Sequence, residues 1–143
     1  GGVMSQTKAL ADWRSPGGQP GDLADVIVGL LSLGNTHHEI KKVSKPDFYR
    51  ALSQLQEEFP DRFPGVVFTG TGEYVYSKSI GDALERALRL GIDVMNPRFY
   101  YIGVQEREDA ERNLRLIREN TGGSFLEMLE PVANRFAALV KES

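Results

Sequence analysis

The chain has 143 residues, of which 41% are hydrophobic and 26% are charged, and its formal net charge is −3. This length suits one domain with its own hydrophobic core. The sequence contains no cysteine, which excludes a disulfide framework, a thiolate nucleophile and a zinc–thiolate site. An acidic chain has no overall attraction to phosphates, so any nucleic-acid binding must use a local basic patch.

Residues 1–21 are predicted to form a flexible N-terminal arm, and residues 22–143 a single domain. The arm ends in the sequence SPGGQPG, whose three glycines and two prolines cannot continue a helix. Trp13 is the exception within the arm. So large an aromatic side chain docks either on the domain or on a partner, and we expect it on the domain.

The first predicted helix covers residues 22–33, DLADVIVGLLSL, which are apolar nearly all round. This pattern is typical of a buried helix, and the pair Gly34 and Asn35 is expected to end it. The β-branched residues at its centre leave a strand as the alternative.

The stretch from residue 36 to residue 59 predicts two short helices joined by a tight turn. Thr36 and Glu39 have the spacing of a capping box, in which a hydroxyl and a carboxylate satisfy each other's free amides. Ser44 can cap the second helix, with Pro46 in its first turn. A brief helix, a sharp turn and a second helix form a helix-turn-helix, so nucleic-acid binding is the first hypothesis.

Apolar spacing and turn residues give the bounds of this second helix and predict three further elements. The second helix covers residues 47–59, and another helix is predicted over 78–90, capped by Ser77. Two β-hairpins are predicted, one over 66–76 around a Gly-rich turn and one over 92–104 around an Asn-Pro turn. The apolar stripe of the first of these helices consists of Phe48, Ala51, Leu52, Leu55 and Phe59.

The remaining residues, 106–143, predict a helical extension. Residues 106–119 form a charge-rich helix, and a last helix begins at Ser124, with Pro131 expected to kink it. The last helix has more large apolar residues than one buried face needs, so it either covers the core or forms a dimer surface. The candidate interface residues are Phe125, Met128, Leu129, Val132, Phe136 and Val140.

Most of the local positive charge lies at the joint of the predicted helix-turn-helix. Four basic residues there oppose the carboxylates of Glu39 and Asp47, and basic side chains near helix ends are suited to phosphate contact. The alternative is an ordinary solvated surface. The candidate DNA-binding residues are Lys41, Lys42, Lys45 and Arg50.

The order of helices and hairpin over residues 22–76 resembles that of the winged helix-turn-helix regulators. The segment PDFYRALSQL, residues 46–55, resembles their recognition helix, and residues 69–73 would be the wing. The resemblance implies a transcription regulator that binds double-stranded DNA.

A weaker similarity to the SocA/Panacea-type antitoxin domains lies in residues 72–92, GEYVYSKSIGDALERALRLGI. It implies a protein-interaction module, antitoxin-like or an assembly adaptor, with no nucleic-acid binding.

An aromatic set lies on the predicted strands: Tyr74, Tyr76, Phe99, Tyr100 and Tyr101. Aromatic side chains on a sheet can stack nucleobases, but cross-strand packing is the expected role because strands favour aromatics.

No arrangement of residues predicts catalysis or metal binding. The adjacent His37 and His38 would point about 100° apart on a helix, so one metal ion would not bind both. We expect no enzyme activity, no cofactor and no metal site. The sequence therefore predicts a cytoplasmic α+β domain of winged-helix type with two β-hairpins and a C-terminal helical extension, without a membrane partner and as a candidate homodimer.

Overall fold

The computed structural model describes Trp13 and residues 18–87, 92–95 and 101–141. These residues form α-helices, one small antiparallel sheet and two short 3₁₀ turns, so the predicted α+β class is confirmed. The elements in chain order are α1 (Leu23–His38), β1 (Val43–Ser44), α2 (Lys45–Glu58), η2 (Pro60–Arg62), η3 (Gly72–Tyr74), α3 (Lys78–Ala87), β2 (Ile92–Met95), β3 (Tyr101–Val104), α4 (Arg107–Thr121) and α5 (Gly123–Lys141).

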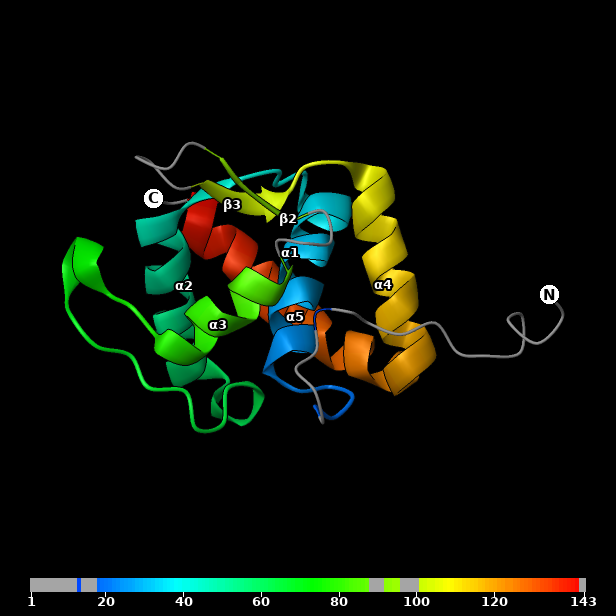
Figure 1. The fold of residues 1–143 in the computed structure, drawn as a ribbon, viewed down its shortest axis with the longest axis horizontal. Helices are drawn as coiled ribbons and strands as arrows, with labels where there is room; N and C mark the ends of the chain where they lie inside the picture. Colours follow the sequence, from blue (N-terminus) through cyan, green and yellow to red (C-terminus); the bar gives the residue numbers. More distant parts are fainter. Residues whose placement is uncertain (1–12, 14–17, 88–91, 96–100, 142–143) are drawn as a thin grey trace, which may run out of the picture.

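Helix α1 is the centre of the molecule. Asp22 caps its start by accepting a hydrogen bond from the N–H of Ala24 at 3.2 Å. Every residue from Ala24 to Asn35 is buried, because α3, α4 and α5 all pack against this helix (Figure 1). The prediction of a buried helix is confirmed, and the strand alternative is wrong.

The predicted end of α1 at Gly34 and Asn35 is wrong, and so is the separate short helix after it. The helix continues to His38 and ends where Glu39 adopts a left-handed conformation with φ 57°. The Asn35 side-chain amide donates to the carbonyl of Val104 at 2.6 Å. This contact holds Asn35 inside the helix instead of at its end. Thr36 donates to the carbonyl of Ser32 at 3.0 Å, and is therefore a mid-helix residue rather than an N-cap.

Helix α2 matches its prediction closely. Ser44 caps it by accepting from the N–H of Asp47 at 3.3 Å, and Pro46 lies in the first turn. The predicted stripe is buried at four positions and half-buried at Phe59. The buried ones are Phe48, Ala51, Leu52 and Leu55.

The sheet has the strand order β1–β3–β2, with both pairs antiparallel. The predicted second hairpin is confirmed as β2 and β3, which pair from Ile92 with Val104 to Met95 with Tyr101. Its Asn-Pro turn lies outside the described residues. The two-residue strand β1, which the sequence did not predict, adds an edge to this hairpin by pairing Val43 with Ile102.

The predicted first hairpin, over residues 66–76, is wrong as a pair of strands. One isolated bridge joins Thr69 and Tyr76, and the turn between them contains η3. We call residues 66–76 the tyrosine loop, and it projects from one end of the molecule (Figure 1). A hairpin with no third strand is marginal in water.

Trp13 docks on the domain, as predicted. Its side chain is only 1% exposed, and its indole N–H donates to the Asp25 carboxylate of α1 at 2.7 Å. Its carbonyl accepts from Arg86 of α3 at 2.9 Å. At this residue the predicted flexible arm is part of the packed structure, while residues 1–12 and 14–17 lie outside the described residues.

The C-terminal helices α4 and α5 complete the core. Leu129, Val132 and Phe136 of α5 are buried within the chain, and the Phe136 ring packs edge-on against Phe48 with centroids 6.0 Å apart. Of the two alternatives predicted for this helix, these three residues follow the first: they cover the core, and they are inaccessible to a second copy. Phe125 and Val140 are half-buried against the core, and Met128 is exposed. No helix in the described part of the chain is both long and apolar enough to span a membrane.

Candidate nucleic-acid interface

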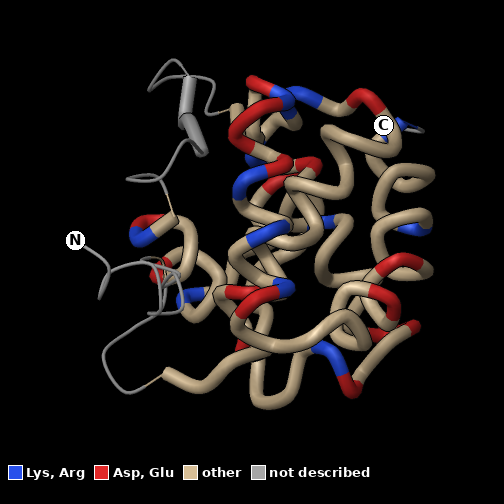
Figure 2. The backbone as a smooth tube through the Cα atoms, turned by 90° about the vertical axis from the view of Figure 1, so that its right-hand side faces the viewer, with Lys and Arg blue, Asp and Glu red and all other residues tan. Residues whose placement is uncertain are grey.

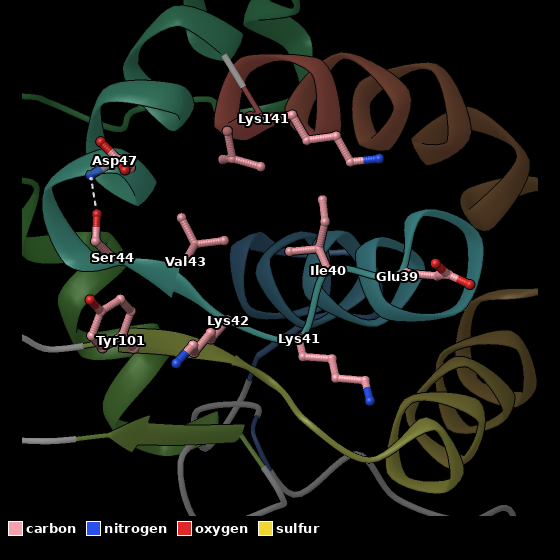
Figure 3. A pocket seen from close by; sticks show the side chains of 10 residues that line it. Glu39, Ile40, Lys41, Lys42, Val43, Ser44, Asp47, Tyr101 and Lys141 are labelled. Atoms are coloured by element: carbon pink, nitrogen blue, oxygen red, sulfur yellow. Dashed lines mark hydrogen bonds between the residues drawn. The ribbon is translucent and has the colours of Figure 1, made fainter. Parts of the chain in front are cut away.

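A surface pocket of about 530 Å³ lies where the loop after α1 meets the ends of α2, α5 and β3. We call it the lysine pocket, because Lys41, Lys42 and Lys141 are among its lining residues (Figure 3). Its centre is apolar, formed by Ile40, Val43 and Val140. The lining is completed by Glu39, Ser44, Asp47 and Tyr101.

The backbone between α1 and β1 places Lys41 and Lys42 at the surface. The left-handed residue Glu39 reverses the chain, and the N–H of Ile40 then donates to the carbonyl of Gly34 at 2.9 Å. A Cβ atom at Gly103 of β3 would overlap the Lys41 carbonyl. Glycine at that position lets β3 lie directly against the backbone of the two lysines.

The side chains of Lys41 and Lys42 are exposed. The Lys42 ammonium lies 4.8 Å from the centroid of the Tyr101 ring, close enough for a cation–π interaction that restrains it above the sheet. Tyr101 itself is half-buried beneath this lysine. Its ring therefore supports a cation rather than offering an open face to a nucleobase.

The structure brings together only part of the predicted DNA-binding set. Lys41 and Lys42 share the lysine pocket, and Lys45 begins α2 next to it, half-buried. Arg50 lies outside the pocket. It forms an ion pair with Asp47, one turn earlier in α2, and lines a separate hollow with Arg135.

Lys141 is the basic residue that the sequence analysis missed. It is the last residue of α5 and reaches the pocket from the opposite end of the chain (Figure 3). A lone lysine near a C-terminus carries no local signal of this contact, since about a hundred residues separate it from Lys41.

The remaining predicted candidates lie elsewhere. Tyr76 packs on Tyr49 of α2, with ring centroids 5.2 Å apart, whereas Tyr74 extends into solvent. Phe99 and Tyr100 lie outside the described residues. Burial raises the pKa of Tyr49 well above its usual value, and the neighbouring Tyr76 and Asp82 raise it further.

The two histidines do not form a common site. His37 is exposed, and Nε2 of His38 lies 2.9 Å from the Oδ1 atom of Asn134. Among the residues the structure describes, no group of three histidine or acidic side chains could hold a metal ion.

Charge on the face around α4 contrasts with the lysine pocket. Acidic and basic residues alternate over that face, and no region of one sign stands out (Figure 2). Arg112 and Asp109 pair there at 3.2 Å. The lysine pocket is therefore the more concentrated cationic surface, although Glu39 and Asp47 bound it.

No family model, no curated protein and no solved structure matches this chain.

Proposed function

We propose that this protein is a winged-helix-type module that binds double-stranded DNA, chiefly through the phosphate backbone. The observation that carries the proposal is the element order: three helices, α1, α2 and α3, lead into the antiparallel hairpin of β2 and β3. That order supports a different assignment of parts from the one made on sequence. The helix before the wing is α3, not residues 47–59, and the wing is the 92–104 hairpin, not residues 69–73.

The charges favour phosphate contact over base reading. On α3, which holds the place of the recognition helix, Lys78 pairs with Asp82 at 3.1 Å, and Glu85 is exposed. This helix therefore offers a surface of mixed sign. Lys41 and Lys42 project from the loop before the N-terminal end of α2, and helix N-termini favour anions. Together these groups can fix the module on a duplex without selecting a sequence.

The test is a DNA-shift titration over a range of salt concentrations. We expect binding at low salt and a steep loss as salt rises, because phosphate contacts release counterions. The double variant Lys41→Glu, Lys42→Glu should abolish the shift on every duplex tested. A matched control is Arg115→Glu, Arg118→Glu, which makes the same charge change at exposed positions of α4 and should retain binding.

Two results would overturn the proposal. One is the absence of any shift by the intact chain at low salt. The other is equal loss in both double variants, which would trace the effect to net charge rather than to the lysine pocket.

The second candidate function is a protein-interaction module, antitoxin-like or an assembly adaptor. The apolar centre of the lysine pocket, Ile40, Val43 and Val140, favours it, because a DNA backbone has no group to fill such a hollow. A peptide with an apolar and an acidic side chain would fill it. Failure of the shift experiment, with a folded protein, would leave this candidate in place.

A further inference from the structure

The tyrosine loop exposes an unusual amount of apolar surface. The described residues include four large hydrophobic side chains that are well exposed, and three belong to this loop: Val67 at 68%, Tyr74 at 81% and Tyr76 at 41%. Single exposed apolar residues are ordinary, whereas a group of them at one projecting segment indicates an interaction surface.

The loop is held in a defined shape. The backbones of Thr69 and Tyr76 exchange two hydrogen bonds of 2.9 Å, and the N–H of Tyr74 donates to the carbonyl of Thr71 at 3.0 Å. Gly70 turns the chain with φ 82°. At the base, the Gln56 side chain donates to the carbonyl of Val66 at 2.5 Å. A rigid aromatic segment loses little entropy on binding, which favours its use as a contact.

The charge of the loop identifies what it can bind. Its single charged residue is Glu73, next to Tyr74 at the tip. A negative tip repels DNA and anionic lipid, so those partners are disfavoured. It requires instead a hollow with an apolar floor for the tyrosine ring and cations around it for the carboxylate.

The same chain carries such a hollow. The lysine pocket has an apolar centre and is lined by three lysines, against the two carboxylates of Glu39 and Asp47, as Figure 3 shows. Its volume of about 530 Å³ lies within the range of pockets that hold small ligands. Tyrosine is among the residues that contribute most to protein interfaces when its ring fills a pocket and its hydroxyl stays hydrated.

We propose that the tyrosine loop of one copy docks in the lysine pocket of a second copy. Tyr74 lies on the apolar centre, and the Glu73 carboxylate pairs with Lys41, Lys42 or Lys141. The contact is head-to-tail, because tip and pocket are different surfaces of one chain. Each dimer keeps one free tip and one free pocket, so the assembly grows with concentration unless it closes into a ring.

This inference goes beyond DNA binding and does not depend on it. Both use Lys41 and Lys42, but only self-association uses the loop tip. Tyr74→Ala should therefore remove self-association and retain the DNA shift, at the same strength or stronger because Lys41 and Lys42 are freed, so the two proposals can fail separately.

The experiment is sedimentation velocity on the full chain, without DNA, over a range of concentrations. The intact protein should form species larger than a monomer as concentration rises. A tip variant, Glu73→Lys with Tyr74→Ala, and a pocket variant, Lys41→Glu with Lys42→Glu, should each stay monomeric. Truncating a central interface tyrosine typically weakens binding by about tenfold or more.

The deciding measurement mixes the two variants. The pocket variant keeps a working tip, and the tip variant keeps a working pocket. An equimolar mixture should form a heterodimer and grow no further. Circular dichroism melts should show both variants folded, since the altered residues are all exposed. Arg115→Glu with Arg118→Glu controls for net charge and Met128→Ala for loss of an exposed apolar side chain, and both should assemble like the intact chain.

A monomeric intact protein at all concentrations would overturn the proposal. So would assembly that survives in the tip variant, or a mixture of folded variants that fails to associate.

Discussion

Two segments of this chain have the same local signature of a β-hairpin, and only one becomes part of a sheet. Residues 92–95 and 101–104 form β2 and β3, with β1 as a third strand. Residues 66–76 form one isolated bridge around a 3₁₀ turn. Both segments are rich in β-branched and aromatic residues around a turn, so the difference comes from what the rest of the chain places beside them.

The segment that forms the sheet has β1 paired on its edge, and helices cover one of its faces. Ile102 and Val104 are buried, and α1, α2 and α4 all contact β3. The tyrosine loop has no third strand beside it. Val66 is buried, and Phe68 and Val75 pack against the core, but Val67 and Tyr74 remain in solvent. The comparison teaches that strand propensity reports fit to a half-buried surface, and that a strand forms where such a surface exists.

The largest expected loss of stability comes from a substitution in the segment that forms the sheet. Ile102→Ala should lower the free energy of unfolding by about 2–5 kcal/mol, because a side chain that is 1% exposed leaves a cavity when truncated. Val67→Ala in the tyrosine loop is the matched truncation at an exposed site, and we expect a change within about 0.5 kcal/mol. Urea denaturation of both variants measures the difference. Equal losses would mean that the loop is covered after all.

A smaller effect tests the aromatic contact of the tyrosine loop with α2. Tyr76→Ala removes the ring that packs at 5.2 Å on Tyr49, and aromatic pairs contribute about 0.5–1.5 kcal/mol beyond the area they bury. We expect a loss of that order, with faster proteolysis confined to the loop. Tyr76→Phe keeps the ring and should restore most of the stability. Global unfolding in Tyr76→Ala would show that the loop supports the core.

Sequence and structure agree best where local signals and tertiary contacts agree. The start of α2 followed from Ser44 and Pro46, which act within one turn. The end of α1 did not follow, since Asn35 bonds to Val104, 69 residues away, and no local rule contains that contact. A local stop signal was therefore overridden by packing.

The candidate site shows the same division. Lys41 and Lys42 were predicted as part of the basic cluster between two helices, and the structure places both on one pocket. Lys141 and the apolar centre of that pocket depend on where α5 ends, which composition and spacing do not encode. The tyrosine loop was predicted as a wing, and it differs because no strand lies beside it.

A third effect appears only at alkaline pH. Burial raises the pKa of Tyr49 in the folded chain, whereas the unfolded chain loses this proton near pH ~10. The folded state therefore holds the proton more tightly, so stability is complete below about pH 10 and falls as pH rises above it. Tyr49→Phe should reduce this loss of unfolding free energy, measured by chemical denaturation from neutral pH to about pH 11.

Tyr76→Ala should lower the pH at which the Tyr49 hydroxyl loses its proton in an absorbance titration, because Tyr49 becomes less buried. An identical alkaline loss in Tyr49→Phe would assign it to other groups.

The smallest expected change in stability is at Tyr74. This variant separates the role of the tyrosine loop from that of the sheet most clearly. Its side chain is exposed at the tip of the tyrosine loop, so Tyr74→Ala should change the free energy of unfolding by less than about 0.5 kcal/mol. Stability alone therefore does not explain an aromatic side chain at this projecting site.

Because the loop is proposed as an interaction surface, the same substitution should reduce self-association while the melting temperature stays constant. Ile102→Ala should show the opposite pattern, with lost stability and unchanged association of the fraction that remains folded. Calorimetric melts and sedimentation on both variants measure the two quantities independently. Loss of both quantities in Tyr74→Ala would place this ring in the fold, and the distinction between the covered and the uncovered segment would then fail.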